Sequence, residues 1–377
     1  MNFPSAESGY VMLTQLGSRA GTGGGNRPSE IAVMPVLVLN VHSRCNCRCV
    51  MCDIWKRDVS LEVRAADLAW HRESMQRLSV RWVVLSGGEP LLHSDLRSLC
   101  TFFRELQIKV TLLTTGLLLS KRAADVAELF DEVIVSLDGP SSVHDLIRGV
   151  AGGFDLIERG VGAVRRLGPG IRITARTTVQ KANRCQLRAT VAAAKRIGLD
   201  GVSFLAADVT SEAFNRPQLW PSERQDQIAL KAPELSELNE EIEELISGHE
   251  GDIRTGYIAE SPEKLRRITH HFAAHLGFVE PESPDCNAPW VSAVVEADGS
   301  VRPCFFHPAI GSLHGSTLEE VVNGETARSF RNSLIVAQDP TCRRCVCSLK
   351  LSREGTSHRS SIWGEELFSN MSLEVSR

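Results

Sequence analysis

Apolar runs of strand length alternate with amphipathic helical stretches through the first part of the chain. Strands are predicted at 36–41, 81–86, 109–114, 132–136, 171–179 and 201–205. Apolar residues spaced three or four positions apart predict helices at 61–78, 93–106, 120–130, 154–167 and 184–197. Strands that alternate with helices form parallel sheets with right-handed crossovers. The pattern therefore predicts an α/β fold, and periodicity alone leaves both a doubly wound sheet and a barrel open.

The pattern changes after the last of these strands. A proline-rich stretch leads to an acidic helix at 234–246, whose charges are predicted to form a solvated face. Apolar residues return at 291–304, around an Asp298-Gly299 turn that is typical of a β-hairpin. The expected organisation is a flexible leader at 1–30, a main domain at 31–210, a linker with the acidic helix at 211–283, a small hairpin domain at 284–347 and a polar tail at 348–377.

Composition narrows the class of protein. The chain has 377 residues and a formal net charge of -4, so no basic excess points to a nucleic-acid partner. Its 11 cysteines occur without a secretory signal or a long apolar span. Such a distribution argues against a disulfide framework and for metal binding in a reducing compartment. We therefore expect a cytoplasmic protein that has no membrane partner.

Three cysteines follow the first strand at a spacing that suits a metal cluster. Cys45, Cys49 and Cys52 form a CxxxCxxC sequence in one short loop. Three thiolates can hold three irons of a [4Fe-4S] cluster and leave the fourth iron open for chemistry. A structural zinc site is the alternative, although zinc ligands usually come as CxxC pairs. Cys47 is interpreted as a non-ligand between them, and Cys100 as a core residue of its helix.

The CxxxCxxC loop and the strand before it resemble the radical S-adenosylmethionine (radical SAM) superfamily. The resemblance implies a partial (β/α)6 TIM-like barrel whose active site lies at the carboxyl ends of the strands. It also implies that the open iron binds S-adenosylmethionine and cleaves it reductively to a 5'-deoxyadenosyl radical. An electron donor such as flavodoxin or ferredoxin is then an expected partner.

Motifs at later strand ends fit this resemblance. Gly87, Gly88 and Glu89 look like the family's GGE motif, which contacts the methionine amino group, and the glycines would let the backbone approach a ligand closely. Ser136 and Asp138 share one face at the end of the fourth strand, which fits the family's ribose-contacting position. An Asp-Gly-Pro turn is the alternative for Asp138.

The fifth strand carries a further candidate, Arg176. If it faces inward, its guanidinium can pair with the methionine carboxylate, and a solvated arginine is the alternative. His144 and Arg148 follow the fourth strand and are expected to cap an element or to face solvent. The sequence identifies no catalytic acid or base.

A second group of cysteines occupies the C-terminal part. Cys286 and Cys304 flank the predicted hairpin, and Cys342 and Cys345 form a CxxC pair, so four thiolates are available to close a second [4Fe-4S] cluster. The C-x12-G-x4-C portion resembles the auxiliary-cluster domain called SPASM, and the short set of cysteines fits its reduced version, called Twitch. Cys347 is an extra thiol that could replace Cys345. A zinc site made by the same cysteines is the alternative.

These resemblances imply a radical SAM iron-sulfur oxidoreductase that abstracts hydrogen from its substrate. A closed auxiliary cluster suits electron transfer, so the first interpretation is dehydrogenation of a small polar molecule such as a sugar or an aminocyclitol. A peptide (RiPP) maturase that forms a crosslink would use the same parts. A cyclase of the molybdenum-cofactor type is disfavoured, because its second cluster has three cysteines and this chain offers four. A non-catalytic zinc-binding protein is the remaining alternative.

Overall fold

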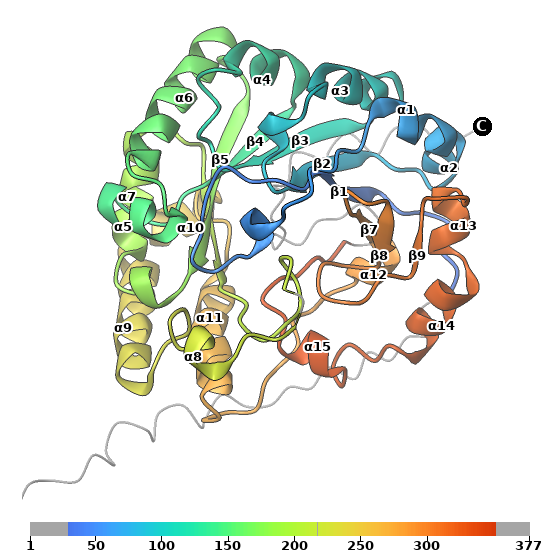
Figure 1. Ribbon diagram of the computed structural model, residues 1–377. Coiled ribbons are helices and arrows are strands. Elements are labelled where there is room, and N and C mark those ends of the chain that lie inside the picture. The colour runs from blue at the N-terminus through green and yellow to red at the C-terminus, as the bar shows by residue number, and fades with distance from the viewer. Residues whose placement is uncertain (1–28, 217, 352–377) are drawn as a thin grey trace, which may run out of the picture.

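The computed structural model describes residues 29–216 and 218–351; the predicted leader and nearly all of the predicted polar tail lie outside the described residues. The six predicted strands are present and pair in parallel, in the order β6-β5-β4-β3-β2-β1. The sheet does not close on itself, so the fold is the expected partial barrel (Figure 1). The strand bounds are β1 Val36–His42, β2 Trp82–Gly87, β3 Lys109–Thr114, β4 Glu132–Ser136, β5 Arg172–Val179 and β6 Val202–Ala206.

Helices cover the outer face of this sheet (Figure 1). The predicted helix at 61–78 begins only at Ala65. The residues before Ala65 stay extended because Glu62 forms an antiparallel bridge with His42. It is also divided by a short 3-10 turn. The bounds are α1 Ala65–Leu68, α2 Arg72–Arg77, α3 Leu96–Glu105, α4 Ala123–Leu129, α5 Ser141–Arg148, α6 Gly153–Leu167 and α7 Leu187–Arg196.

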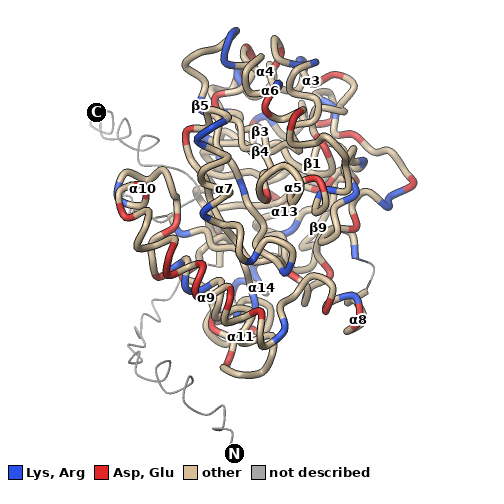
Figure 2. Tube along the Cα trace, turned by 90° about the vertical axis from the view of Figure 1, so that its left-hand side faces the viewer, with Lys and Arg blue, Asp and Glu red and all other residues tan. Residues whose placement is uncertain are grey.

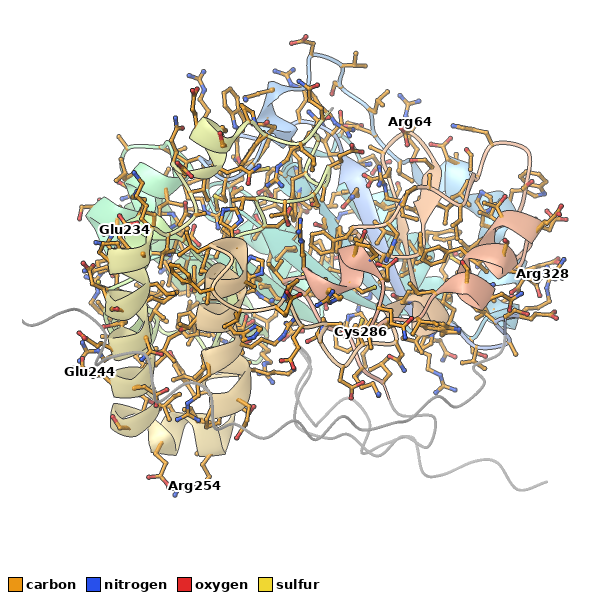
Figure 3. The ribbon with its side chains drawn as sticks, turned by 90° about the horizontal axis from the view of Figure 1, so that it is seen from below. Arg64, Glu234, Glu244, Arg254, Cys286 and Arg328 are labelled. Atoms are coloured by element: carbon orange, nitrogen blue, oxygen red, sulfur yellow. The ribbon has the colours of Figure 1, made fainter. Side chains whose placement is uncertain are left out.

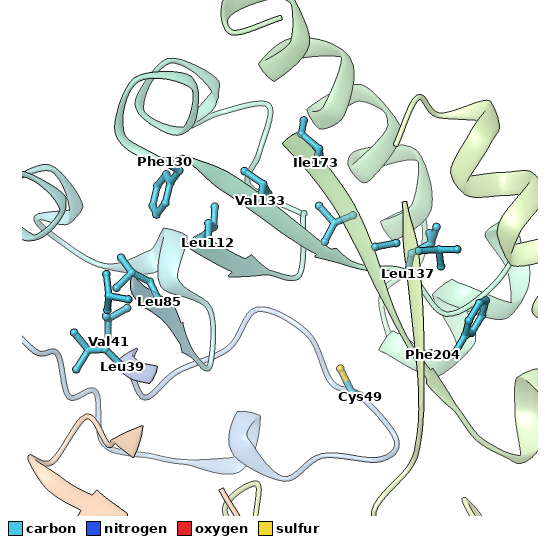
Figure 4. Close-up of a cluster of buried hydrophobic side chains, with 14 of the residues drawn as sticks. Leu39, Val41, Cys49, Leu85, Leu112, Phe130, Val133, Leu137, Ile173 and Phe204 are labelled. Atoms are coloured by element: carbon cyan, nitrogen blue, oxygen red, sulfur yellow. The ribbon is translucent and has the colours of Figure 1, made fainter. Parts of the chain in front are cut away.

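A single row of apolar side chains crosses the parallel strands. Leu39, Leu85, Leu112, Val133 and Ile173 are register partners on successive strands, and all are fully buried (Figure 4). Since side chains alternate between the two faces of a strand, this row fills the space beneath the outer helices and leaves the alternate positions to the inner face. Cys100 is fully buried in this core, as predicted.

The predicted hairpin continues the same sheet. β7 (Ser292–Val295) pairs in parallel with β1, and β8 (Ser300–Arg302) and β9 (Gly311–Ser312) follow in antiparallel pairing, which gives nine strands. Gly299 forms the turn with φ +79, a conformation that L side chains rarely adopt. Asn40 Nδ2 donates to Glu296 Oε2 at 2.8 Å and fastens the ends of β1 and β7 together. The C-terminal cysteines are therefore carried by an element continuous with the barrel.

The linker forms a pair of packed helices, α9 (Ala232–Gly248) and α11 (Pro262–His275), joined through α10 (Glu250–Thr255). The expectation that the acidic face of α9 is solvated is confirmed at Glu240 and Glu244, which are exposed, and is wrong at Glu241. Acidic positions run along α9 in Figure 2, but Glu241 is only 4% exposed and pairs with Arg188 of α7 at 2.9 Å. Glu237 pairs with Arg184, which precedes α7, and Glu243 pairs with Arg266 of α11.

The remaining helices are short and mostly belong to the C-terminal part. Within residues 29–216 and 218–351, none of the helices is long and apolar enough to cross a membrane. Their bounds are η1 Ile54–Lys56, η2 Ala69–His71, η3 Pro90–Leu92, η4 Lys181–Asn183, α8 Ser222–Gln225, α12 Ala288–Val291, α13 Leu318–Val322, α14 Glu325–Ser333 and α15 Pro340–Arg343.

Removing the Glu241 carboxylate should loosen the contact between α9 and α7. Glu241 Oε1 accepts the backbone N–H of Arg188 at 2.8 Å, so it caps the first turn of α7 from another helix. We expect Glu241→Ala to lower the free energy of unfolding by about 1–2 kcal/mol, measured by urea denaturation. Glu240→Ala, an exposed position on the same helix, is the control. An equal loss in both variants would contradict the capping role.

Candidate active site and auxiliary metal centre

The loop after β1 directs backbone N–H groups at its own sulfurs. Cys47 N lies 3.5 Å from Cys45 Sγ, and Ile54 N lies 3.4 Å from Cys52 Sγ. Donors aimed at a sulfur favour its thiolate form, which is the form that binds metal. Figure 4 shows the third predicted ligand, Cys49, on the same loop. The donor set therefore fits an iron-sulfur cluster.

Arg148 supplies a buried positive charge beside this loop. Its Nη1 lies 3.6 Å from Cys49 Sγ. The hydrogen bond from Cys47 lowers the pKa of Cys49 to about 6, and the charge of Arg148 helps to overcome the opposing effect of burial. Hydrogen bonds to Cys45 and Cys49 raise the pKa of Cys47. Burial raises the pKa of Cys52, another predicted ligand, to about 12. The assignment of Cys47 as a non-ligand stays a prediction.

Asp138 holds Arg148 in place. Its carboxylate is fully buried, with Oδ2 accepting from Arg148 Nε at 2.5 Å and Oδ1 accepting from the backbone N–H of Thr178 at 2.8 Å. Burial disfavours the charged guanidinium, but Asp138 and the nearby thiolates outweigh it and raise the pKa of Arg148. The expectation that His144 and Arg148 cap or face solvent is therefore corrected, since both are buried around Asp138.

The end of α5 also closes the loop through its backbone. Arg48 N donates to Arg148 O at 2.9 Å, and Val50 N donates to Ile147 O at 3.0 Å. These carbonyls belong to the last turn of α5, where a helix leaves its acceptors without partners of its own. Gly149 ends the helix with φ +64, and a Cβ there would lie 2.7 Å from Arg48 O. The sequence HDLIRG thus positions the cysteine loop, a role that its pattern did not predict.

Gly88 marks the closest approach of β2 to the cysteine loop. A Cβ on Gly88 would lie 2.0 Å from Arg44 O, and Gly88 N donates to His42 O at 2.8 Å. We expected Gly87 and Gly88 to admit a ligand; the structure shows that Gly88 admits the backbone of the loop itself. Gly87, with φ +118, is required by its own backbone conformation.

Glu89 ties the ends of β2 and β3 together. Its fully buried carboxylate accepts from Leu91 N, Thr114 Oγ1, and both the N–H and the hydroxyl of Thr115, at 2.7–2.9 Å. Burial raises the pKa of Glu89, although the bonds from Thr115 oppose it. The Thr115 hydroxyl also lies 2.9 Å from Asn46 Oδ1, so the network reaches the cysteine loop. Contact of this motif with the methionine amino group stays a prediction.

A segment to which the sequence assigned no specific role packs on the other side of the loop. Arg216 is buried, donates to Asp208 Oδ2 at 2.6 Å and to Met51 O at 3.2 Å, and lies 3.9 Å from the ring centroid of Trp220. Trp220 Nε1 in turn donates to Asp53 Oδ2 at 2.7 Å. An Arg and a Trp within a proline-rich stretch were the only signal in the sequence.

Ser136 and Arg176 are register partners on β4 and β5, whose alternate residues face inward. Arg176 lines a cavity together with Glu260 and Cys347, and its Nε has no hydrogen-bond partner among the described residues. Burial lowers the pKa of Arg176, against the effect of Glu260. The structure therefore brings Ser136 and Arg176 together, while the Asp138 carboxylate is engaged with Arg148 and Thr178.

The five C-terminal cysteines are free thiols in one region. Burial raises the pKa of Cys304 and that of Cys347 to about 11. Burial also raises the pKa of Cys342, with Asp339 adding to the effect, and that of Cys345, with Cys347 adding to it. Thiolates crowded in this way are stabilised by a bound cation, as a metal cluster supplies. Figure 3 places Cys286 between Glu234 of α9 and Arg328 of α14.

His307 is an unpredicted neighbour of these thiols. Its Nε2 lies 3.4 Å from Cys342 Sγ and 3.7 Å from Asp339 Oδ1. Asp339 Oδ1 also accepts the backbone N–H of Cys342 at 2.8 Å. The two side chains therefore orient Cys342, and nothing in the sequence spacing pointed to them.

An open parallel barrel with thiols in the loop after its first strand, joined to a cysteine-bearing hairpin, defines a metal-dependent α/β enzyme class with chemistry at the strand ends. The profile of the radical SAM superfamily matches residues 39–202, and that of the SPASM iron-sulfur cluster-binding domain matches residues 286–346. The chain belongs to the radical SAM superfamily and carries a C-terminal SPASM domain. Its cofactors are a [4Fe-4S] cluster that binds S-adenosylmethionine, S-adenosylmethionine itself and an auxiliary [4Fe-4S] cluster.

Curated relatives differ in their named products. Pre-heme d1 synthase of Dinoroseobacter shibae is 36% identical over 157 residues, which span 41% of this chain and only 38% of that protein. Fe-coproporphyrin III synthase of Methanosarcina barkeri is 24% identical over 88% of this chain and 86% of its own. PqqA peptide cyclase of Ruegeria pomeroyi is 25% identical over 85% of this chain and 82% of its own.

Solved structures share the fold. Streptococcus suis SuiB bound to S-adenosylmethionine aligns with a TM-score of 0.58 at 17% identity, covering 85% of this chain and 74% of SuiB. The enzyme anSMEcpe, bound to AdoMet and a peptide, aligns with a TM-score of 0.56 at 19% identity, covering 82% of this chain and 85% of its own. At these identities the likeness concerns the fold alone.

The ligand assignment predicts the metal content. Anaerobically reconstituted protein should carry about eight irons, two cubane clusters' worth, and replacing Cys45, Cys49 and Cys52 together by Ala should remove about half. Cys100→Ala, which alters a buried core thiol, should keep the full load. Iron is measured colorimetrically against protein concentration. A triple variant with undiminished iron would show that these cysteines are not the ligands.

Gly88→Ala should displace the cysteine loop, because the added Cβ meets the Arg44 carbonyl at 2.0 Å. We expect the variant to lose about half of its iron, as the triple cysteine variant does, and to lose S-adenosylmethionine binding in equilibrium dialysis. Gly170→Ala is the matched control, since a Cβ there meets nothing within 4 Å. Retention of both properties in Gly88→Ala would mean that the loop can move away without consequence.

Proposed function

We propose that this radical SAM enzyme oxidises an organic substrate bound on the inner face of the barrel, between the loop after β1 and the auxiliary cysteines. The directions of β7 and β8 support this position of the substrate. β8 runs antiparallel to β7, with Val301 opposite Val295 and Arg302 opposite Val294. Cys304 therefore lies back toward the amino-terminal level of the sheet, whereas the first cysteine loop leaves β1 at its carboxyl end.

A cavity of about 60 Å³ on the inner face supports the same arrangement. It is lined by Arg176 of β5 and Leu205 of β6 on the barrel side and by Cys347 on the auxiliary side. A substrate group in this cavity would touch β5, β6 and Cys347 of the auxiliary side. We infer that this contact places the substrate where the auxiliary centre can accept an electron from it.

The proposed roles follow from these positions. The boundaries expected for the barrel (31–210), the linker (211–283) and the auxiliary unit (284–347) are retained as part of the proposal, as are the two sites that they contain. The first cluster is assigned to Cys45, Cys49 and Cys52; the auxiliary cluster to Cys286, Cys304, Cys342 and Cys345; and the S-adenosylmethionine contacts to Gly87, Gly88, Glu89 and Ser136.

When bound, the cofactors supply a 5'-deoxyadenosyl radical that removes one hydrogen atom from the substrate and an acceptor for one further electron. The chain's own residues supply position and charge. Arg148 balances the thiolates, and Asp138, predicted at the ribose, is proposed instead to position Arg148. Arg176, predicted at the methionine carboxylate, is proposed to face the substrate, because it shares its cavity with Cys347. An electron donor of the flavodoxin or ferredoxin kind is part of the proposal.

The substrate expected from sequence, a sugar or an aminocyclitol, is the least supported part of the proposal. An aminocyclitol carries an ammonium group, and the cavity presents Arg176, Lys264 and Arg267 with only Glu260 as an acidic group. Like charges in a buried site repel strongly. We therefore retain oxidation and favour a substrate that is not cationic.

A second candidate is peptide crosslinking. Its support is the alignment with PqqA peptide cyclase along 85% of this chain, together with the fold shared with SuiB, which is also known bound to its precursor peptide SuiA. A crosslink and an oxidation both begin with loss of one hydrogen atom from the substrate. They differ in whether the resulting carbon radical loses an electron and a proton or forms a new bond to another atom.

The two candidates are separated by following the hydrogen and the product. Deuterated coproporphyrin, a deuterated peptide and a deuterated polyol are incubated separately with S-adenosylmethionine and a reductant. We expect deuterium from one of them in 5'-deoxyadenosine, measured by mass spectrometry, and a product with a new double bond. Cys304→Ala should still release 5'-deoxyadenosine but suppress that product. A product with a new carbon-carbon or carbon-sulfur bond instead would replace oxidation by crosslinking.

A further inference from the structure

Helix α11 presents basic and imidazole side chains along one face. Lys264, Arg267, His271 and His275 follow one another at spacings of three, four and four residues, which places them on one side of a helix. The other side contributes Leu265 and Phe272 (both fully buried) to the core. A purely structural helix in a linker needs only the apolar side. The basic side instead lines two cavities.

Two cavities lie along this basic side and share Arg267 and His271. The first, of about 60 Å³, is also lined by Arg176 and Cys347. The second, of about 260 Å³, opens between α11 and the auxiliary unit, where Arg344 and Glu282 line it. Because the same two side chains of α11 line both cavities, the cavities are neighbours along this helix.

The charges lining the two cavities are mostly positive. Arg176, Lys264 and Arg267 face Glu260 in the first cavity. Arg267, Arg343 and Arg344 face Glu282 in the second, together with His270, His271 and His275. Arg343 pairs with Glu280, whereas no ion pair of Arg344 occurs among the described residues.

Several of these groups are buried without full compensation. Arg267 donates to the backbone carbonyls of Glu282 at 3.1 Å and Cys345 at 2.9 Å. Arg176 Nε and His271 Nε2 are buried side-chain atoms with no hydrogen-bond partner in the described part of the chain. Burying such groups is costly unless something satisfies them. These orphaned donors and acceptors line the cavities, so a ligand there would supply what the protein does not.

We propose that α11 and its two cavities bind a substrate that carries two carboxylates, one in each cavity. The first carboxylate lies between Arg176, Lys264 and Arg267, and the second lies near Arg344 and His275. Arginine and lysine match a carboxylate by charge and by hydrogen bonding. This inference rests on the proposed function in one respect only, namely that the occupant of the cavities is the substrate.

The lining also limits the kind of anion and its length. Glu260 and Glu282, one in each cavity, disfavour a doubly charged phosphate more than a singly charged carboxylate. Along α11, Arg267 beside the first carboxylate and His275 near the second are separated by a rise of about 12 Å at 1.5 Å per residue, so the two carboxylates lie roughly 12 Å apart. Phe204, Leu205 and Val346 give the first cavity an apolar wall for the carbon skeleton.

Linear dicarboxylates of different lengths test the distance between the two proposed carboxylate sites. Decanedioate spans about the required distance when extended, butanedioate is too short to reach both cavities, and decanoate has the same chain with one carboxylate. We expect the fully reconstituted protein to bind decanedioate at least about tenfold more tightly than either of the others in anaerobic titration calorimetry, since one charge-assisted contact is worth at least that much. Equal affinities, or no saturable binding of decanedioate, would overturn the inference.

Charge-removing variants locate the two ends. Arg344→Gln should reduce decanedioate affinity about tenfold and leave decanoate affinity nearly unchanged. Arg328→Gln is the matched control, because Arg328 is an exposed arginine of α14, far from α9 and α11 in Figure 3. Equal weakening by both variants would show that binding follows the general charge of the surface and would overturn the assignment.

Arg176→Gln tests the inner end. It should weaken decanedioate and leave the affinity for S-adenosylmethionine unchanged, with the iron content confirming that both clusters are retained. Weakened S-adenosylmethionine binding with unchanged decanedioate binding would mean that Arg176 contacts S-adenosylmethionine, as the sequence predicted. It would overturn the proposed contact between Arg176 and a substrate carboxylate. If Arg176→Gln loses iron, Arg344→Gln carries the test, because that side chain is exposed.

The binding experiments require no turnover. They are performed without reductant, so a failure of the oxidation would leave their outcome unaffected. Conversely, an oxidation demonstrated on a substrate without carboxylates would support the proposed function and contradict the dicarboxylate assignment. Each proposal can therefore be contradicted without contradicting the other.

Discussion

The active site depends on a buried positive charge held by a buried carboxylate. Three thiols on one loop cannot all ionise in a protein interior unless a cation lies near them, because the low dielectric makes unbalanced charge costly. Arg148 provides that charge beside Cys49, and Asp138 provides the partner that keeps the guanidinium oriented. Asp138 is fixed in its turn by the backbone N–H of Thr178 on β5. The crossover from β4 through α5 is therefore as much a part of the first metal site as the cysteine loop itself.

Backbone contacts make the same site rigid. The loop donates to the carbonyls at the end of α5 and to the carbonyl of Phe214, and it receives the N–H groups that follow β2. Gly88 is small enough for β2 to approach, and Arg216 fills the opposite side with its guanidinium stacked on Trp220. Each contact uses a different element, so the geometry of the thiols depends on the completed barrel and on the segment that follows it.

Local periodicity was sufficient for the six parallel strands and for most of the outer helices, because each of these depends on residues close in sequence. It did not predict α5 or the division of the helix expected at 61–78. It was insufficient where a role depends on a distant partner. Arg148 was expected to cap or face solvent, since nothing within α5 reveals that Asp138 and Cys49 lie beside it. Glu241 belongs to an acidic run that resembles a solvated face, and only the position of α7 explains its burial. Gly88 was correctly recognised as a site of close approach, and the neighbour that the structure shows there is the backbone of the cysteine loop.

The same principle of charge balance links the two ends of the inner face. At the cysteine loop, the chain supplies both the cation, Arg148, and its anion, Asp138. In the two cavities beside α11 it supplies mainly cations, and burial lowers the pKa of Arg176 on β5 and of Arg267 on α11, against the effect of nearby acidic groups. A protein retains such groups at a cost in stability, and an anionic ligand recovers that cost when it binds. Arg148 and Asp138 thus balance each other beside the cysteine loop, whereas Glu260 and Glu282 balance only part of the positive charge that lines the two cavities.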